Sequence, residues 1–364
     1  MTGKLRVAIL YGGKSAEHEI SLQSAKSVAE VMDKNKYEII LIGIGRDGKW
    51  YLDSEQKLLA ASGSGEITES ENLLIKVNPG GTQSHLLECP EETAIGHLDV
   101  VFPVLHGPLG EDGAVQGFLK LANVPFVGAD VLGSAIGMDK DVMKRLLRDA
   151  GIPVARFMVF AWLQKDKINF SQIKKELGLP CFIKPANLGS SVGIHRVSDE
   201  KSFITAVADA FHYDRKIIIE ETIRGREIEC SVLGNENPLA SIPGEIIPKH
   251  DFYSYEAKYL DEHGALLEIP AKLPQDAVKD IQALAVKAYQ VLCCEGMARV
   301  DMFLCPDNNI FINEINTIPG FTRISMYPKL WEASGLSYSR LIDRLIELAI
   351  DRHEKTNRLK STFR

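Results

Sequence analysis

Short apolar runs alternate with amphipathic stretches over the first third of the chain, and this alternation restricts the fold more than any other feature. The runs predict strands and the amphipathic stretches predict helices. The predicted strands cover 5–11, 37–44, 99–105 and 125–127, and the helices cover 15–32 and 114–122. Strands and helices in this order predict an open, mostly parallel sheet. Residues 61–97, rich in glycine with serine or proline, predict irregular structure with short strands at most.

The pattern changes after a helix predicted over 139–150, which Gly151 and Pro153 end. From there the sequence predicts pairs of strands around helices, over 181–184, 192–197, 216–221 and 227–233. A helix over 276–292, a hairpin over 297–316 and a C-terminal helix over 337–353 follow. A long polar and aromatic loop covers 248–264.

Composition narrows the class of protein. A chain of 364 residues predicts two or three domains. The formal charge of -7 argues against nucleic-acid binding, so an anionic ligand would need lysines gathered in one cleft. The sequence contains neither a long apolar run nor a signal peptide, which predicts a cytoplasmic protein without a membrane span. The six cysteines form no Cys-x-x-Cys pair, which favours reduced thiols over disulfides.

Two glycine-containing segments resemble known motifs without matching them. Gly12–Ser15 ends like a phosphate-binding loop, but that motif requires glycine where Ala8 stands. What remains is a strand–glycine–helix turn whose helix we expect to begin near Ser15, with Glu17 in its first turn. Glu17 is then either a favourable charge at a helix N-terminus or part of a site.

The second segment, Gly189–Gly193, matches the nucleophile elbow of serine hydrolases, which requires a helix after the serine. The residues that follow alternate like a strand, so the hydrolase context is missing. A loop of this composition between two strands can instead bind phosphate through backbone N–H groups, with Lys184 supplying positive charge. The alternative is an ordinary flexible turn.

The hairpin over 297–316 is the most specific signal. If its turn is centred on 306–309, Asp301 faces Glu314 and Arg299 faces Asn316, all on one face. Two carboxylates opposed at about 5 Å repel each other by roughly 3 kcal/mol. A divalent cation would remove this repulsion, and two carboxylates with an Asn amide suit Mg²⁺. The alternative is a solvated face, although Val300, Met302 and Ile315 on the other face predict that the hairpin covers a core.

The histidines do not offer a rival metal site, because neither His-Glu-x-x-His nor a zinc-like Cys/His spacing occurs. His106, at the end of a predicted strand, is the one histidine in an obvious site position. A lone histidine there is more often structural.

The chain resembles the D-alanine–D-alanine ligases of the ATP-grasp fold over nearly its whole length. Seven blocks in the same order carry the resemblance, although each alone is weak. They are Gly12–Ser21, Leu105–Gly113, Met138–Lys140, Lys184-Pro with Gly189–Gly193, Glu256–Tyr259, Ala298–Asp301 and Asn313–Gly320.

The resemblance implies a nucleotide site. Lys140 and Lys184 would bind the ATP phosphates with help from Ser191, and Asn313 would also contact the nucleotide. Adenine would lie against Glu220, Glu221 and Ile223, and the ribose against Glu227. Asp301, Glu314 and Asn316 would bind two Mg²⁺ ions, with Mn²⁺ as an alternative.

The resemblance also implies substrate-binding and catalytic residues. Glu17 would bind the ammonium group of the first D-alanine, in a hydrogen-bonded triad with Ser190 and Tyr259. Arg299 and the backbone of Gly320 would stabilise an oxyanion. Ser325 and Met326 would line the second D-alanine site. Lys258 and His106 would join the catalytic residues, and His106 would also contact the substrate. The loop over 248–264 would be a lid that excludes water.

The fold implied by the resemblance has an N-terminal α/β domain over 1–128 and two ATP-grasp subdomains over 129–220 and 221–364. The implied reaction forms D-alanyl phosphate and then D-alanyl-D-alanine, for peptidoglycan synthesis, in a homodimer.

The intact Glu256–Tyr259 block favours D-alanine over D-lactate or D-serine as the second substrate. A serine hydrolase using Ser191 and a non-catalytic nucleotide-binding protein are the alternatives.

Overall fold

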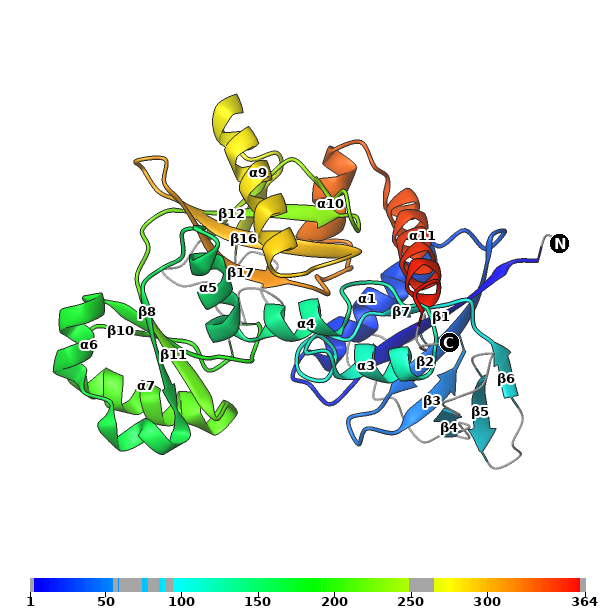
Figure 1. The fold of residues 1–364 in the computed structure, drawn as a ribbon, viewed down its shortest axis with the longest axis horizontal. Coiled ribbons are helices and arrows are strands. Elements are labelled where there is room, and N and C mark those ends of the chain that lie inside the picture. The colour runs from blue at the N-terminus through cyan, green and yellow to red at the C-terminus, as the bar shows by residue number, and fades with distance from the viewer. Residues whose placement is uncertain are drawn as a thin grey trace.

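Three sheets make up the computed structural model, which describes residues 3–54, 58, 74–77, 85–89, 94–190, 192–248 and 265–360. They follow one another along the chain, with the central sheet and its helices set apart from the N-terminal sheet (Figure 1). The predicted loop over 248–264 lies outside the described residues except for Pro248. None of the helices in the described part of the chain combines the length and apolar character of a membrane span.

The N-terminal sheet has the strand order β6-β5-β4-β3-β2-β1-β7. Its strands are β1 (Leu5–Gly12), β2 (Tyr37–Ile44), β3 (Trp50–Asp53), β4 (Leu74–Val77), β5 (His85–Cys89), β6 (Ala94–His97) and β7 (Val100–Pro103). Strand β1 pairs in parallel with β2 and β7, as the alternation of strands and helices predicts. The remaining pairs, from β2 to β6, are antiparallel. The parallel part is therefore confined to β2, β1 and β7, and the prediction of a mostly parallel sheet was wrong, because the described strands β3 to β6 pair antiparallel.

Two further predictions for this domain were wrong in detail. Residues 125–127 make only an isolated parallel bridge, between Phe126 and Val101, and not a strand. Helix α1 (His18–Val31) begins after Glu17, which is its N-cap residue, rather than near Ser15. The turn before it is longer because the Ser15 hydroxyl donates to the carbonyl of His106 and accepts from the Glu17 N–H. These bonds place Glu17 close to the segment that follows β7.

The central region begins with two helices and continues into an antiparallel sheet of order β10-β9-β11-β8. The helices are α4 (Val131–Met138) and α5 (Lys140–Asp149), and the second agrees with the predicted helix. The sheet and its covering helices are β8 (Phe157–Ala161), the 3₁₀ helix η1 (Trp162–Lys167), α6 (Phe170–Leu177), β9 (Cys181–Pro185), β10 (His195–Val197), α7 (Glu200–Tyr213) and β11 (Lys216–Glu221). Helices α6 and α7 pack on one face through Ile173, Phe203 and Ala210, which leaves the other face for the site.

The C-terminal sheet is antiparallel, with the order β15-β14-β12-β16-β17, and β13 pairs with β12 outside this path. Its elements are β12 (Arg226–Leu233), β13 (Leu239–Ala240), β14 (Gly244–Pro248), β15 (Ala265–Glu268), α9 (Gln275–Val291), β16 (Met297–Leu304), β17 (Ile310–Asn316), α10 (Met326–Ala333) and α11 (Tyr338–Asn357). Val300, Met302 and Ile315 are buried in the core beneath this sheet, as the hairpin pattern predicts.

Helix α11 belongs to the last segment of the chain but packs on the first sheet. Its buried residues Leu341, Ile342 and Leu345 share one core with Val7 and Phe102 of β1 and β7. In Figure 1 this helix lies beside the N-terminal strands. The region predicted as the C-terminal subdomain therefore contributes its last helix to the N-terminal core.

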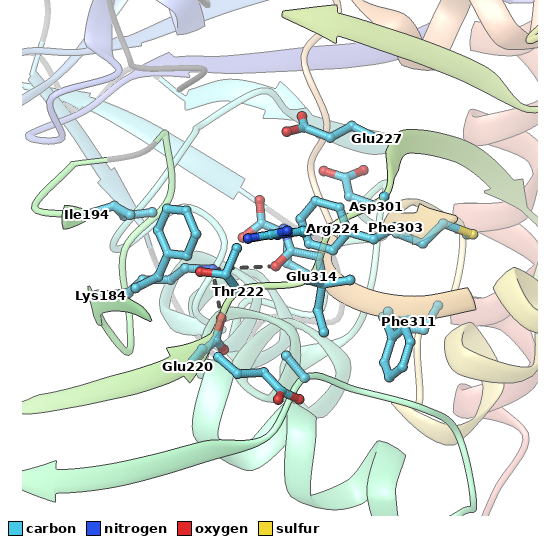
Figure 2. A pocket seen from close by; sticks show the side chains of 18 of the residues that line it. Lys184, Ile194, Glu220, Thr222, Arg224, Glu227, Asp301, Phe303, Phe311 and Glu314 are labelled. Atoms are coloured by element: carbon cyan, nitrogen blue, oxygen red, sulfur yellow. Dashed lines mark hydrogen bonds and ion pairs between the residues drawn. The ribbon is translucent and has the colours of Figure 1, made fainter. Parts of the chain in front are cut away.

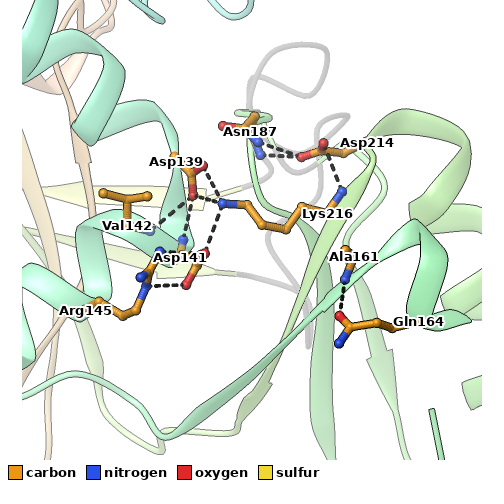
Figure 3. Close-up of polar contacts among 9 residues, drawn as sticks. All are labelled: Asp139, Asp141, Val142, Arg145, Ala161, Gln164, Asn187, Asp214 and Lys216. Carbon is orange, nitrogen blue, oxygen red and sulfur yellow. Dashed lines mark hydrogen bonds and ion pairs between the residues drawn. The ribbon is translucent and has the colours of Figure 1, made fainter. Parts of the chain in front are cut away.

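Helix α5 is tied to the central sheet by a cluster of charged side chains (Figure 3). Asp139 caps α5 by accepting from the N–H groups of Asp141 and Val142. The Lys216 ammonium at the start of β11 lies 2.6 Å from an Asp139 oxygen and 3.0 Å from Asp141. Burial alone would raise the pKa of Asp141, but hydrogen bonds from Lys216 and Arg145 lower it below its ordinary value of 3.8.

Replacing Lys216 tests this connection. We expect Lys216→Met to lower the free energy of unfolding by about 1–2 kcal/mol at pH 7, because two carboxylates lose a shared donor. A carboxylate with a lowered pKa contributes stability above its ordinary pKa, so the loss should disappear as the pH falls below 3.8. Urea unfolding against pH measures both, with exposed Lys175→Met on α6 as the control. An equal loss in both variants would contradict the assignment.

Candidate functional site

A cavity of about 420 Å³ separates the central sheet from the C-terminal sheet. Lys184 and Glu220 reach it from β9 and β11, whereas Glu227, Asp301 and Glu314 reach it from the facing sheet (Figure 2). Apolar side chains line the cavity between them, namely Phe182, Ile194, Ile223, Ile246, Met302, Phe303 and Phe311. An apolar slot with charged groups at defined places is typical of a site for a small ligand.

A buried charge cluster forms the wall on the central sheet. The Glu220 carboxylate lies 2.8 Å from the Lys184 ammonium and 3.1 Å from that of Lys144. Burial alone would raise the pKa of Glu220, but the two lysines lower it to about 2. Burial lowers the pKa of Lys144, while attraction to Glu220 outweighs burial and raises that of Lys184. The cluster holds Lys184 in place at the cavity.

Lys140 reaches the same region from the first position of α5. Its ammonium donates to the carbonyl of Leu188 at 2.6 Å and lies 3.4 Å from a carboxylate oxygen of Glu314. Leu188 belongs to the loop between β9 and β10, so Lys140 links this loop to the hairpin. Ser191, in the same loop, lies outside the described residues. Asn313 accepts from Lys184 at 3.5 Å and lines the cavity.

The hairpin places its polar side chains as the sequence predicts. Asp301 is opposite Glu314 and Arg299 is opposite Asn316. The register then shifts by one residue between Asp301 and Met302, so Met302 faces Ile312 and Asn313 is the extra residue of a bulge. The predicted register is therefore correct beside the site and wrong toward the turn.

Arg299 and Asn316 hold the Asp301 carboxylate. The guanidinium donates to both Asp301 oxygens at 2.7 Å, and the Asn316 amide donates to one of them at 2.9 Å. Glu314, with its side chain partly exposed, faces the cavity next to Lys140. The donor set of two carboxylates and an amide fits a hard divalent cation. Cation binding would require Asp301 to exchange at least part of its contact with Arg299.

Glu17 lies at a second place, where three loops meet. The Ser190 hydroxyl donates to its carboxylate. A Cβ atom on Gly107 would come within 2.6 Å of the other carboxylate oxygen, and one on Gly189 within 3.6 Å. Gly107 also has a φ of +77°, which favours glycine. The structure therefore brings Glu17 and Ser190 together as predicted, while Tyr259 lies outside the described residues.

Comparison with known proteins assigns the chain to a family. The family models described as the N-terminus and the C-terminus of D-ala D-ala ligase match residues 6–129 and 146–347. A D-alanine–D-alanine ligase of Oceanobacillus iheyensis is 54% identical over 99% of both chains, and D-alanine–D-alanine ligase A of Escherichia coli K12 is 52% identical over 99% of this chain and 100% of the relative. The chain belongs to the D-alanine–D-alanine ligase family.

Solved structures agree with this assignment and with the ATP-grasp fold. The D-alanine-D-alanine ligase from Coxiella burnetii is 43% identical with a TM-score of 0.87, covering 97% of this chain and 96% of that one. The VanG D-Ala:D-Ser ligase from Enterococcus faecalis is 39% identical with a TM-score of 0.86, covering 95% and 100%. The family is ATP-dependent, which fits a cavity lined by buried lysines.

The loop after the hairpin contains further residues that the resemblance singles out, namely Gly320, Ser325 and Met326. A Cβ atom on Gly320 would lie 2.7 Å from the Ser325 hydroxyl, so this glycine and serine are close neighbours. Ser325 precedes α10, and its hydroxyl accepts from the Thr322 N–H. The Met326 side chain is buried against Ile246 and Leu330. Lys258 lies outside the described residues.

His106 is buried and supports that loop. Its Nδ1 lies 3.0 Å from the carbonyl of Ile318, which can only accept, so Nδ1 carries the proton. Nε2 then accepts from the Ser24 hydroxyl, which in turn accepts from the Phe321 N–H. Both ring nitrogens are thus engaged with protein. These bonds tie His106 to the loop that carries Gly320, and its catalytic and substrate-binding role stays a prediction.

The sequence reasoning missed three residues near these sites: Lys144 and Glu229, which are buried, and Glu111, which is partly buried. Lys144 is one helical turn after Lys140, and Glu229 faces Asp301 from β12. Glu111 accepts from the N–H groups of Gly107 and Ile318. Burial, with the Glu17 charge adding to it, raises the pKa of Glu111 to about 8. For Lys144, a spacing of four residues on a predicted helix was the available signal.

The burial of His106 predicts a pH dependence. Burial lowers the pKa of His106 to about 4 from 6.5. Below pH 6.5 the unfolded chain takes up a proton that the folded chain does not, so stability falls between pH 6.5 and 4 by about 3 kcal/mol. In His106→Gln this part of the pH dependence should vanish, and urea unfolding from pH 7.5 to 4 measures it. Exposed His212→Gln is the control. A constant difference between wild type and His106→Gln over this range would refute the assignment.

Proposed function

We propose that the protein is an ATP- and Mg²⁺-dependent ligase that condenses two D-alanine molecules to D-alanyl-D-alanine and forms ADP. The observation that carries this proposal is the facing pair Asp301 and Glu314, with Arg299 beside it, at a cavity whose other wall presents Lys184. Full-length similarity to D-alanine–D-alanine ligases supports it. A serine hydrolase is disfavoured, because the loop Gly189–Gly193 is followed by strand β10 and not by a helix.

ATP would lie between the two sheets. Glu220, Glu221 and Ile223 would contact adenine at the apolar end, and Glu227 the ribose, since all four line the cavity. Lys140 and Lys184 would bind the phosphates with Ser191, and Asn313 would complete the nucleotide contacts. Positioned positive charge is what phosphoryl transfer requires, because charge spreads over the transferred oxygens.

Asp301, Glu314 and Asn316 would hold two Mg²⁺ ions, or Mn²⁺ in their place. Bound there, the ions would neutralise phosphate charge in the transition state. The backbone positions of these residues are set by the pairing of β16 and β17 above a buried core, so the acids are already side by side.

Each D-alanine would have its own subsite. Glu17, with Ser190 and Tyr259, would bind the ammonium group of the first. Ser325 and the backbone N–H of Met326 would bind the second at the N-terminus of α10. Arg299 and the N–H of Gly320 would stabilise the oxyanion, and Lys258 and the rest of the 248–264 loop would close the site.

The reaction would proceed in two steps. A carboxylate oxygen of the first D-alanine attacks the γ-phosphorus, the bond to the β-phosphate oxygen breaks, and D-alanyl phosphate and ADP form. The amine of the second D-alanine attacks the acyl carbon, loses a proton, and phosphate leaves. Exclusion of water matters because the acyl phosphate would otherwise be hydrolysed.

The family also supports a cellular role. The dipeptide would enter peptidoglycan precursors, and the enzyme would act in the cytoplasm as a homodimer. Size-exclusion chromatography with light scattering tests the dimer.

Product analysis tests the activity itself. Incubation with D-alanine, ATP and Mg²⁺ should yield one ADP and one phosphate for each D-alanyl-D-alanine, by mass spectrometry and a coupled ADP assay. D-serine and D-lactate offered with D-alanine should give little mixed product. Because the VanG ligase is a structural neighbour, a dominant D-alanyl-D-serine product would reassign the second substrate. Absence of any ATP-dependent product would reject the ligase.

Glu314→Gln tests the cation site. Removing one carboxylate should lower kcat on the order of 100-fold and raise the Mg²⁺ concentration needed for half-maximal rate. Glu347→Gln, an exposed residue of α11 paired with Arg344, is the control. A Mg²⁺ titration curve unchanged in Glu314→Gln would remove the hairpin from the cation site.

A further inference from the structure

Three carboxylates stand in a row across neighbouring strands of the C-terminal sheet. Glu229 of β12 is opposite Asp301 of β16, and Asp301 is opposite Glu314 of β17. Residues opposite each other point to the same face, and all three side chains line the cavity. Glu229 is the most buried of them, with a side-chain exposure of 8%. No family role for Glu229 is implied by the resemblance.

The guanidinium of Arg299 lies between two members of this row. Its Nε is 2.7 Å from Asp301 Oδ1 and 2.9 Å from Glu229 Oε2, and its second donating nitrogen is 2.7 Å from Asp301 Oδ2. Nε carries a single hydrogen, so it can make one strong hydrogen bond at a time. In this structure that bond goes to Asp301. Glu229 and Asp301 therefore compete for the same donor.

Cation binding changes the balance between these two carboxylates. Both oxygens of Asp301 accept from Arg299, whereas a cation would need at least one of them. A buried guanidinium without a carboxylate partner is costly, so Arg299 needs another acceptor when Asp301 turns to the cation. Glu229 is already at ion-pair distance.

We propose that Glu229 is a positioning residue that accepts the hydrogen bond from Arg299 when Asp301 binds the cation. By holding the guanidinium from the β12 side, Glu229 would keep it beside the cavity, where the oxyanion would form. It thus couples occupation of the cation site to the orientation of Arg299. This inference rests on the proposed function, but its first consequence is a change in metal affinity that does not depend on turnover.

Binding of Mn²⁺ in the presence of ADP tests that consequence without D-alanine. In Glu229→Gln, Arg299 loses its alternative anionic partner, so Mn²⁺ should bind about tenfold more weakly, by electron paramagnetic resonance titration. Glu245→Gln is a matched control, because Glu245 is also buried in this sheet and paired with an arginine, Arg226, yet does not line the cavity. Equal Mn²⁺ affinities in the two variants would overturn the proposal.

A second pair of variants distinguishes two explanations: exchange of the Arg299 hydrogen bond from Asp301 to Glu229, which is the proposed transfer, and direct attraction between Glu229 and the cation. In an Arg299→Met background there is no guanidinium to exchange partners, so adding Glu229→Gln should change Mn²⁺ affinity by less than about twofold. If the same tenfold effect persisted without Arg299, Glu229 would act through its charge alone and the proposed transfer would be wrong. Urea unfolding of each variant establishes that it is folded.

Turnover supplies the remaining readout. Glu229→Gln should lower kcat about tenfold while KM for ATP changes less than threefold, and should weaken binding of a phosphinate mimic of the tetrahedral intermediate in parallel. Unchanged phosphinate affinity would overturn the positioning role. If the wild-type protein makes no dipeptide, the proposed function fails, whereas a tenfold difference in Mn²⁺ affinity would still support the coupling of Glu229 to the cation site.

Discussion

Asp301 and Glu314 face each other across a hairpin, and Glu229 extends the same row on the next strand. Each neighbouring pair of carboxylates repels by roughly 3 kcal/mol at an effective dielectric of 20 and a separation near 5 Å. The strands cannot move apart to relieve this repulsion, because Val300, Met302 and Ile315 on the opposite face are buried in the core. Arg299 and Lys140 offset the repulsion in this structure, and in the proposed complex the cations would do so.

The opposite wall of the cavity has the complementary charge. There Lys144 and Lys184 surround the Glu220 carboxylate, and Lys140 extends toward the hairpin. Lysines on one side and acids on the other would place nucleotide phosphates and cations in a fixed order between the sheets. This explains how a chain with a formal charge of -7 can bind a polyanion. A few buried lysines replace a basic surface.

Short-range features of the site could be predicted from the sequence, whereas features that join distant strands could not. That Asp301 faces Glu314 could be predicted from a short turn and the two-residue alternation of strand side chains. The bulge at Asn313 could not, because this alternation does not show where an extra residue is inserted. Glu229 was missed because the register between β12 and β16 is set by sheet packing over a long separation. Likewise, the first helix was predicted too early because the bond from Ser15 to His106 joins two distant loops.

The buried triad of Lys144, Glu220 and Lys184 is difficult to explain as a device for stability. Taking three charges out of water is costly, and well-packed apolar side chains often stabilise a core as well or better. What the triad provides is a Lys184 ammonium whose position is fixed before any ligand arrives, with Glu220 bound between two cations. A preorganised charge requires no rearrangement during phosphoryl transfer, which is where such a group lowers a barrier most. The free-energy cost of burying these charges is therefore better explained by the chemistry of the cavity than by the folding of the sheet.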